Sequence, residues 1–581
     1  MTNTVAKLSK SVREYKRDAI FTPILVVAEV AMDVVIPMLI SHLIDFGITP
    51  GDMDYIYKVG FQLVFACLAA LALGVLSGRF AAKASAGFAK NLRKDMYYNV
   101  QNFAFSNIDK FSTPSIITRM TTDVTNVQMS FQMMIRVAVR APIMLVSALF
   151  MAFRLGGKLA MVYLIVIPVL GFGLYFISIS VAKIFKRAFK RYDALNAAVQ
   201  ENVSGIRVVK SYVREDYEIE KFNAMSNEMR QDFTQAENRL ALNMPMMQLC
   251  IYGTMTAIFW FGSRFIMNGS MTTGNLMSLV TYTMQMLNSM MMLSMVFTMI
   301  VMSRASMERI SELLAETPDI RSGEAAVEEV RDGSIEFRNV SFSYAGKDGN
   351  NSLMDVDLSI RSGETIGIIG ATGSAKSTLV QLIPRLYDAT GGEVLVGGVN
   401  VRDYDLKALR NSVAMVLQKN VLFSGTIKSN LRWGDENATD EEMIAACKHA
   451  QADDFIQSFP DRYDSRIEQG GTNVSGGQKQ RLCIARALLK KPKILILDDS
   501  TSAVDTKTDA LIRDALAHDL ADTTKIIVAQ RVSSIQEADR IIVLDEGRIN
   551  GIGTHEELLA TNEIYREVFN SQQKGGDEEN V

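Results

Sequence analysis

Long apolar runs fill the first half of the chain, whereas the second half has only short ones. A helix that crosses a lipid bilayer needs about 20 largely apolar residues. Six runs in the first half reach that length, namely 19–45, 58–82, 130–153, 158–183, 243–268 and 274–302. The pattern therefore predicts an α-helical transmembrane domain over 1–311, with six spans, long cytoplasmic loops and a lipid bilayer around it.

The pattern changes after the last run. Residues 312–334 are acidic and polar with proline and glycine breaks, which is typical of a linker. Beyond them, short strand-like runs such as 365–369 alternate with helix-like stretches, as in an α/β domain. We therefore expect a nucleotide-binding α/β domain over 335–573. Acids and glycines predict a disordered tail over 574–581.

Basic residues are spread unevenly over the loops of the first half. The N-terminal segment and the loops 84–129 and 184–242 carry several Lys and Arg residues, whereas 46–57 and 269–273 carry none. Because cytoplasmic loops are rich in Lys and Arg, this predicts a multi-pass protein of the cell (plasma or inner) membrane with both termini cytoplasmic. The short turn 154–157, flanked by basic residues, is the exception. The first apolar run is too long for a cleaved signal peptide and predicts a retained anchor.

Both long loops have helical patterns with few breaks, so the spans are expected to continue beyond the bilayer. Sharp turns are predicted near 111–119, which contains Pro114, and near 199–210, which contains Gly205. Each turn could present a short helix to a cytoplasmic domain.

Charge and cysteine content exclude some classes of function. A net charge of −3 predicts no nucleic-acid partner. The four cysteines are Cys67, Cys250, Cys447 and Cys483, and they form no CxxC pair. With the four histidines also scattered, neither a disulfide framework nor a zinc site is expected.

Two acids, Glu29 and Asp33, lie inside the first apolar run on one helical face. Ionisable residues inside a membrane are costly, which makes both candidates for a substrate cavity. The alternatives are a structural ion pair with Arg136 or Arg140 of the third run, or exposure to water. Pairing within the bundle is the usual fate of such groups.

A stripe of polar residues and methionines follows the last apolar run. Its members are Thr281, Gln285, Asn288, Met292, Met295 and Met299. Flexible, polarizable methionines suit surfaces that accept many apolar shapes, so the stripe predicts a cavity for small-molecule substrates. For any single member, ordinary helix packing is an equally good explanation.

A glycine-rich segment joins the strand-like run 365–369 to a helical pattern. It reads Gly370, Ala371, Thr372, Gly373, Ser374, Ala375, Lys376, Ser377 and Thr378. Strand, glycine loop, Lys-Ser and helix in this order are typical of a phosphate-binding loop. Lys376 would reach the β- and γ-phosphates, and Ser377 would bind Mg²⁺. Ala375 replaces the usual glycine, and its methyl group could strain the loop. The alternative is a chance glycine-rich turn.

The short apolar run 494–497 ends in Asp498. A buried strand that delivers an aspartate at its carboxyl end is the Walker B arrangement. Asp498 is therefore predicted to hold Mg²⁺, directly or through water.

Between these motifs, residues 474–481 read Val-Ser-Gly-Gly-Gln-Lys-Gln-Arg and open a helical pattern. This segment, with Ser475, Gly476, Gly477 and Gln478, resembles the signature motif of ATP-binding-cassette (ABC) transporters.

The resemblance covers nearly the whole chain. Tyr344 resembles the aromatic residue that stacks on adenine, and Gln418 resembles the Q-loop glutamine, which also faces the metal. Glu468 resembles an acid characteristic of exporters, and 502–505 resembles the D-loop with Asp505. A membrane domain followed by a P-loop ABC domain resembles a multidrug-type exporter half-transporter, which implies ATP and Mg²⁺.

Two catalytic positions depart from the family pattern. The family has a glutamate after the Walker B aspartate, and here Asp499 is shorter by about 1.5 Å. The family has a histidine in the switch loop, and here Gln530 carries no titrating proton. General-base assistance is worth about 10²–10⁴-fold and depends on reach. Both positions are therefore predicted to be degenerate.

The complete signature motif contrasts with these losses. Family cassettes meet head to tail, so that each ATP lies between the Walker motifs of one and the signature of the other. The contrast predicts a heterodimer with a second ABC half-transporter, which exports amphipathic or apolar drugs, lipids or peptides by alternating access. The alternatives are a slow homodimeric exporter and an ATP-gated channel or sensor. Six spans exclude a soluble ABC ATPase.

Overall fold

The computed structural model describes residues 2–323, 325–346, 349–500 and 503–578. The chain forms two compact units. One comprises Met1–Asn102 with Phe111–Thr317, and the other comprises Phe103–Lys110 with Pro318–Val581.

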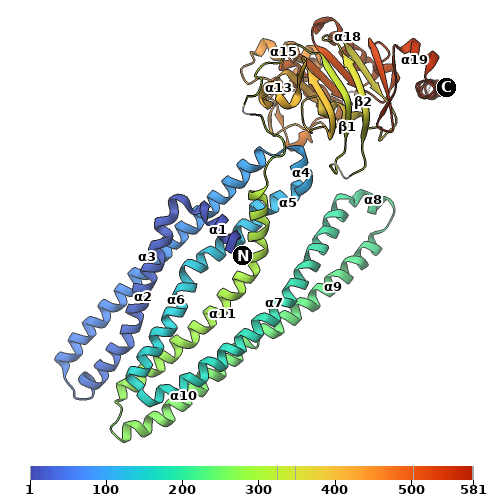
Figure 1. The fold of residues 1–581 in the computed structure, drawn as a ribbon. Helices are drawn as coiled ribbons and strands as arrows, with labels where there is room; N and C mark the ends of the chain where they lie inside the picture. Colours follow the sequence, from blue (N-terminus) through green and yellow to red (C-terminus); the bar gives the residue numbers. More distant parts are fainter. Residues whose placement is uncertain (1, 324, 347–348, 501–502, 579–581) are drawn as a thin grey trace. The chain divides into compact units, whose positions relative to one another are not determined.

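The first unit is built of helices (Figure 1). Their bounds are α1 Thr2–Ser9, η1 Lys10–Tyr15, α2 Lys16–His42, η2 Leu43–Ile48, α3 Met53–Gln101, α5 Thr113–Thr118, η3 Arg119–Asp123, α6 Val124–Gly156, η4 Gly157–Ala160, α7 Met161–Ser204, α8 Ile206–Ser211, α9 Glu215–Leu240, α10 Asn243–Met267 and α11 Thr273–Ala315.

Five helical stretches in the described part of the chain are long and apolar enough to cross a membrane. They are Thr4–Ile48, Met53–Gln101, Thr113–Ser204, Glu215–Met267 and Thr273–Ala315. The third stretch holds two predicted spans, 130–153 and 158–183, because short helical turns continue from α6 into α7. Gly157, with φ of 49°, bends the chain between these two helices, which Figure 1 draws separately. Six separate spans remain a prediction.

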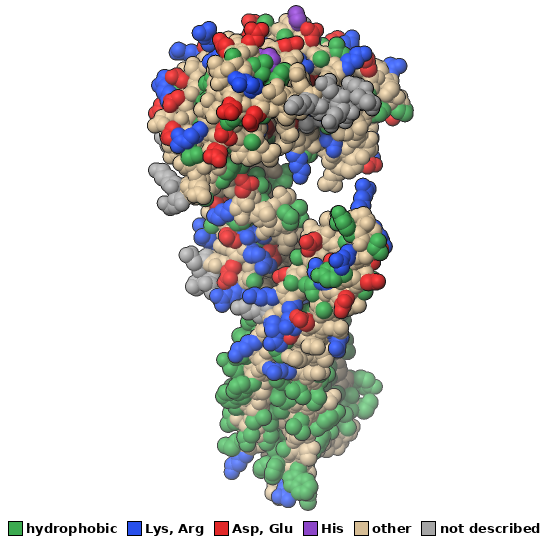
Figure 2. All heavy atoms as spheres, turned by 90° about the vertical axis from the view of Figure 1, so that its right-hand side faces the viewer, with side chains coloured by type: hydrophobic (Ala, Val, Ile, Leu, Met, Phe, Trp, Pro, Cys, Tyr) green, Lys and Arg blue, Asp and Glu red, His purple; other side chains and the backbone are tan. Residues whose placement is uncertain are grey.

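Hydrogen bonds and small residues hold the membrane helices together. Ala148 and Ala152 of α6 are fully buried beside Val26 of α2. The Tyr282 hydroxyl of α11 donates to the Val34 carbonyl of α2 at 2.7 Å. In lipid, close packing and interhelical hydrogen bonds drive helix association. Figure 2 shows hydrophobic side chains over the end of this unit away from α8, and charged side chains over the end that carries α8.

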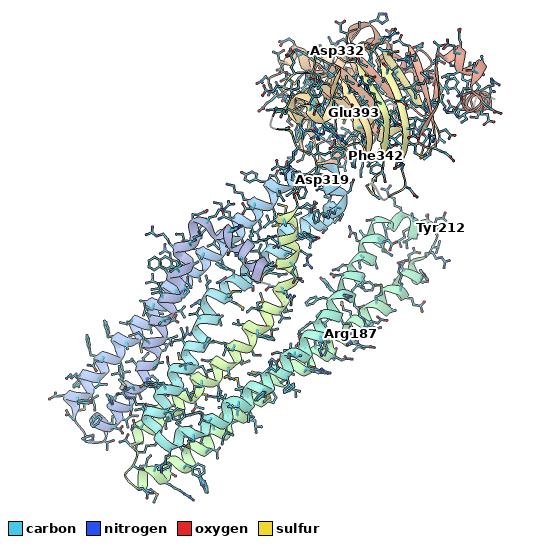
Figure 3. The ribbon with its side chains drawn as sticks, in the orientation of Figure 1. Arg187, Tyr212, Asp319, Asp332, Phe342 and Glu393 are labelled. Carbon is cyan, nitrogen blue, oxygen red and sulfur yellow. The ribbon has the colours of Figure 1, made fainter. Side chains whose placement is uncertain are left out.

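An ion-pair cluster joins α7 to α9 beyond the predicted spans. Arg187 on α7, labelled in Figure 3, donates to the Asp232 carboxylate of α9 at 2.8 Å. Arg191 approaches the other carboxylate oxygen at 3.1 Å. The hydrogen bond from Arg187 lowers the pKa of Asp232 below its usual range. Two arginines therefore keep this buried carboxylate ionised where the two helices run side by side.

The chain breaks twice between the long helices α3 and α6, once before the predicted range 111–119 and once inside it. The chain leaves α3 after Gln101, and α4 follows at Phe105–Phe111. The Asn107 side chain accepts a hydrogen bond from the Ala104 amide at 3.1 Å and so starts α4 there. The second break is at Ser112, whose φ of 56° separates α4 from α5 inside the predicted range, and Pro114 follows in the first turn of α5.

The turn between α7 and α8 lies within the predicted range 199–210. Gly205 separates α7 from α8. This turn could be predicted because Gly205 ends a long helical pattern in the sequence.

The second unit contains two larger sheets and one small sheet. Its strands are β1 Ile335–Phe342, β2 Leu353–Ile360, β3 Thr365–Ile369, β4 Gly391–Val396, β5 Val399–Asn400, β6 Val413–Val416, β7 Gly425–Thr426, β8 Arg466–Ile467, β9 Ile494–Asp498, β10 Thr524–Val528, β11 Arg540–Asp545 and β12 Arg548–Gly553. The six-stranded sheet has the order β12-β11-β3-β10-β9-β6, and the four-stranded sheet has the order β2-β1-β4-β5. The small sheet pairs β7 with β8.

The second unit also contains helices. Besides α4, they are α12 Lys376–Leu382, η5 Val401–Asp403, α13 Leu406–Ser412, α14 Ile427–Leu431, α15 Asp440–His449, α16 Asp453–Gln457, η6 Arg462–Asp464, η7 Gln469–Gly471, α17 Gly476–Leu489, α18 Thr506–Asp519, η8 Val532–Ser534, α19 His555–Thr561 and α20 Glu563–Glu578. Five strands of the sheet are parallel, and only β12 runs antiparallel to its neighbour. Carboxyl ends of parallel strands meet at one edge, which is where ligands bind in open α/β sheets.

The segments predicted as a linker and a tail on either side of the nucleotide-binding domain contain helical or buried residues in the structure. Of the predicted linker 312–334, the first residues complete α11, which ends at Ala315. The second unit resumes at Pro318, and Val330 is buried in its core. The predicted tail 574–581 begins inside α20, and 579–581 lie outside the described residues. Disorder of the tail therefore stays a prediction.

Candidate nucleotide-binding site

The glycine-rich loop connects the buried strand β3 to α12, as the sequence predicts. Ala375 takes the left-handed conformation, with φ of 69° and ψ of 24°. Lys376 bends back over the loop, and its Nζ donates to the carbonyls of Gly370 and Ala371, both at 2.8 Å. Burial lowers the pKa of Lys376, while the nearby aspartates oppose that shift. The loop therefore presents a half-buried cation beside the start of a helix.

Asp498 ends β9, between β10 and the edge strand β6, and is nearly fully buried. The Ser377 hydroxyl donates to its carboxylate at 2.9 Å. Desolvation raises the pKa of Asp498 above its usual range, and the hydrogen bond from Ser377 offsets part of that shift.

The donor set of this site suits Mg²⁺. The described residues contain no cluster of three or more His, Cys, Asp or Glu side chains that could hold a metal ion by itself. Mg²⁺ typically binds through one or two protein oxygen groups plus substrate phosphates and water, and the Ser377 and Asp498 oxygens match that pattern. ATP with Mg²⁺ would supply the phosphate oxygens that complete such a site.

Asp499 stands at the end of β9 in a strained backbone conformation, with φ of 49°. Gln530 donates through Nε2 to its Oδ2 at 2.7 Å, and Gln418 donates to the same oxygen at 3.3 Å. Asp499 therefore lies under two side-chain amides, one from the segment after β6 and one from the segment after β10. The strand order places β9 beside both.

Tyr344 follows β1 and is half exposed. Its hydroxyl lies 3.0 Å from the Thr378 hydroxyl of α12. Edge contacts with Phe342 and Tyr387 hold the ring, with centroids 4.8 and 5.3 Å away. An exposed aromatic face beside a phosphate loop can stack on a nucleotide base.

A cavity of about 330 Å³ lies at this edge of the sheet. It is lined by Tyr344, Ser352, Thr372, Gly373, Ala375, Lys376, Ser377, Thr378, Gln418, Asp498, Asp499, Val528, Ala529 and Gln530. Most of the predicted residues of the phosphate chemistry therefore come together. Sequence reasoning missed Ser352, Val528 and Ala529, and only the proximity of the last two to Gln530 could have indicated them.

Some predicted site residues lie outside the lining of this cavity. They are Gly370, Ser374, Ser475, Gly476, Gly477, Gln478 and Asp505. Gly370 and Ser374 are part of the loop itself. The other five belong to a separate helix start and the turn that follows β9.

The signature segment forms the N-terminus of α17. The Ser475 hydroxyl accepts from the Gln478 amide at 3.3 Å, and the Gln478 side chain accepts from the Ser475 amide at 2.9 Å. This reciprocal cap leaves the helix N-terminus exposed, where it favours anions. Gln480 accepts from the Ala503 amide at 3.1 Å and so ties α17 to the turn after β9.

The predicted D-loop and the acid before the signature have local roles in the structure. Asp505 caps α18 by accepting from the Thr508 amide at 2.9 Å. Ser502, the first predicted D-loop residue, lies outside the described residues. Glu468 accepts from the Thr472 hydroxyl at 3.0 Å.

The acids of the first span form an ion-pair cluster with Arg140, one of the two predicted partners. Arg140 contacts Glu29 through one guanidinium nitrogen and Asp33, at 2.7 Å, through another. Arg136 instead donates to the Gly74 carbonyl at 3.4 Å. The structural ion pair is therefore confirmed, and it joins α2 to α6.

The predicted cavity stripe is mixed in its exposure. Gln285 donates to the Asp33 carbonyl at 3.1 Å and is half buried, as is Thr281. Asn288, Met292 and Met295 are exposed on α11. These three side chains are free to meet a substrate, while the role of the stripe stays a prediction.

Comparisons with known proteins match both halves of the chain. A family model described as the ABC transporter transmembrane region matches residues 19–290, and one described as ABC transporter matches residues 353–502. The chain is 35% identical to the ABC transporter ATP-binding protein YfiB of Bacillus subtilis, over 94% of this chain and 95% of that protein. It is 36% identical to an ABC transporter ATP-binding protein of Mycobacterium tuberculosis, over 98% of both.

Two further comparisons concern an activity and a fold. The chain is 32% identical to an ATP-dependent lipid A-core flippase of Syntrophus aciditrophicus, over 83% of this chain and 80% of that protein. It also resembles the solved structure of a bacterial Atm1-family ABC exporter with ATP bound, with a TM-score of 0.82. That likeness covers 96% of this chain and 98% of the other at 23% identity, which shows a shared fold.

Proposed function

The chain belongs to the ABC transporter family, and from this premise we propose that it is the degenerate-site half of a heterodimeric exporter. It has the helical membrane domain and the ATP-binding domain of an ATP-hydrolysing ABC exporter. In the proposed complex, a second ABC half-transporter supplies the glutamate and the histidine that this chain lacks.

The observation that carries the proposal is the contact between Asp499 and Gln530. Gln530 donates to the Asp499 carboxylate at 2.7 Å. An amide cannot accept and release a proton as a histidine does. The aspartate side chain is also shorter than glutamate by about 1.5 Å, and general-base assistance worth about 10²–10⁴-fold depends on that reach. The site has what it needs to bind MgATP but lacks two groups for activating water.

The capped N-terminus of α17 supports the second half of the proposal. Ser475 and Gln478 satisfy each other, and the helix start stays exposed to accept a phosphate from a facing cassette. This chain would contribute the N-terminus of α17 to a composite ATP site. The partner would contribute the glutamate and the histidine that activate water in that site.

Amphipathic or apolar small molecules are the proposed substrates. Exposed Met292 and Met295 with Asn288 offer a flexible, mostly apolar surface on α11. The relatives include an ATP-dependent lipid A-core flippase, which supports lipids within this class. ATP-driven closure of the cassettes would move the cavity between two openings, and hydrolysis at the competent site would reset it.

ATPase measurements on the purified full chain, alone and with its partner half-transporter, test the proposal. Little turnover alone and brisk turnover with the partner are expected. The paired substitution Asp499→Glu with Gln530→His should raise the turnover of the chain alone at least about tenfold. Rapid turnover of the unmodified chain alone would contradict the proposal. Nucleotide-dependent conductance without turnover in either sample would favour a channel.

A further inference from the structure

The C-terminal helix α20 reaches the nucleotide site through one side chain, Gln572. Its Nε2 donates to the Gln530 carbonyl at 2.8 Å, and its Oε1 accepts from the Val532 amide at 2.9 Å. Both hydrogen bonds fall on the backbone of the switch segment, which we define as residues 530–532. Gln572 lies 40 residues after Val532 and 42 residues after Gln530 in the sequence.

A single carboxamide can hold both groups because it carries a donor and an acceptor side by side. The Gln572 carboxamide accepts from the Val532 amide and donates to the Gln530 carbonyl, two positions earlier. A residue on a neighbouring parallel strand makes the same two bonds with its backbone. The switch segment thus receives, from a side chain, the pairing that β10 loses where it leaves the sheet.

The Val532 amide is also the start of the short helix η8, whose N-cap residue Arg531 makes no side-chain capping bond. The first amides of a helix have no partner inside the helix and need one from elsewhere. Among the described residues, Gln572 is the group that supplies it.

Apolar packing fixes α20 beside the switch segment. Val532 and Tyr565 are both buried in the same core cluster, and Val568 and Phe569 of α20 pack against that cluster. The Tyr565 hydroxyl also bonds His555 Nδ1 at 2.7 Å. The position of Gln572 is therefore set by a firmly anchored helix.

The same switch segment aims a side chain at the nucleotide cavity. Gln530, whose carbonyl Gln572 holds, donates through its own side chain to Asp499. On the other side of Gln530, the Ala529 amide donates to the Ile368 carbonyl at 3.1 Å. With the chain held on both sides, the direction of the Cα–Cβ bond of Gln530 is restricted. A loose switch segment would let this side chain leave Asp499.

We propose that Gln572 is a positioning residue of the nucleotide site, whose carboxamide holds the switch segment so that residue 530 faces Asp499 and the γ-phosphate. The inference rests on the proposed role of residue 530 at the nucleotide site. It gives the C-terminal helix a task in the ATP reaction without any contact with the nucleotide.

Hydrogen exchange at the Val532 amide tests the contact directly in the full chain. Gln572→Ala should speed that exchange about tenfold, since it removes the acceptor. Gln572→Glu should keep the exchange slow, because a carboxylate still accepts from Val532. The matched control is Gln573→Ala, since the described part of the chain gives Gln573 no side-chain hydrogen bond. Unchanged exchange in Gln572→Ala would overturn the proposal.

A kinetic readout separates positioning from simple stabilisation. In the chain carrying Asp499→Glu and Gln530→His, both Gln572→Ala and Gln572→Glu should lower kcat at least about fivefold and leave KM for ATP unchanged. The glutamate variant has this effect because it cannot donate to the carbonyl of residue 530. A variant whose KM rises and whose unfolding temperature falls along with kcat would refute a positioning role. So would a variant with normal kcat although its Val532 amide exchanges fast. If the paired substitution itself yields no turnover, the proposed function fails, and the exchange result still decides the contact.

Discussion

Ala375 bends the phosphate loop into α12 with a positive φ that favours glycine. For a residue with a Cβ atom, the left-handed region costs about 1 kcal/mol. The loop therefore binds its nucleotide at a conformational cost that the usual glycine would avoid.

Replacing Ala375 by glycine should relieve this strain. We expect Ala375→Gly to tighten MgATP binding or raise the free energy of unfolding, by about 1 kcal/mol in total. Titration of a fluorescent ATP analogue and thermal unfolding would measure the two effects. Ala371→Gly is the matched control, since Ala371 has no positive φ and gains nothing. Equal gains in both variants would argue against strain at Ala375.

The buried carboxyl of Asp498 predicts a pH dependence of metal-assisted binding. Desolvation raises its pKa, and only the ionised form binds Mg²⁺. The Mg²⁺-dependent part of the ATP affinity should be complete above this raised pKa. This Mg²⁺-dependent affinity should be lost as the pH falls through the raised pKa of Asp498. The loss should therefore occur at a higher pH than for an ordinary aspartate. ATP titrations with and without Mg²⁺ across the acidic range would show this, and Asp498→Asn should abolish the dependence.

The site residues that belong to contiguous sequence motifs could be predicted. Gln572 and Ser352, which lie far from these motifs in the sequence, could not. Lys376 and Ser377 begin the helix after β3, and Asp498 is the last residue of β9, so their meeting at one sheet edge follows from the order of elements. Gln572 lies in an ordinary amphipathic helix, and its partners are backbone groups, which leave no trace in residue type. Ser352 likewise reaches the cavity only through the fold.

The two helices α2 and α6 are joined by one arginine and two acids. Arg140 bonds both Glu29 and Asp33, and the Ser77 hydroxyl of α3 adds a bond to Glu29 at 3.2 Å. Removing one member of a buried ion cluster leaves unpaired charge, whereas removing all charges together can be nearly neutral.

Arg140→Gln should therefore lower the free energy of unfolding by about 3–5 kcal/mol. The triple substitution Glu29→Gln, Asp33→Asn and Arg140→Gln should recover most of that loss. Thermal unfolding of the purified proteins in one detergent measures both. A triple variant as unstable as the single one would mean that the cluster does more than neutralise itself.

At the scale of elements, the sequence was reliable where a single strong signal acted. Gly205 marked the start of α8, and the apolar runs marked where long helices lie. In the first long loop, Pro114 follows the break at Ser112 inside the predicted range. The earlier break after α3, where the Asn107 side chain starts α4, has no glycine or proline to mark it. The third helical stretch also hides the turn at Gly157 within continuous helical bonding.

In the proposed function, the whole molecule combines a phosphate-accepting helix start on α17 with weakened chemistry at the end of β9. In a homodimer, each ATP site would contain the signature segment of one copy and the Asp499–Gln530 pair of the other, so the two sites would be alike. In a heterodimer, the Walker side of this chain serves one site and its signature side serves the other. The two sides of the chain should therefore respond differently to substitution only if the partner is a different chain.

Ser475→Asp and Lys376→Ala separate these two cases in the complex with the partner half-transporter. Aspartate is as good an N-cap as serine, so α17 should keep its start, but a carboxylate there repels a phosphate. In a heterodimer, Ser475→Asp should lower ATP turnover at least about tenfold, because it damages the competent site. Lys376→Ala should lower turnover less, because it damages the degenerate site. The same order should appear in substrate transport into vesicles. Equal losses would mean that both sites turn over alike, as in a homodimer, and the asymmetry between Asp499 and the signature would then carry no division of labour.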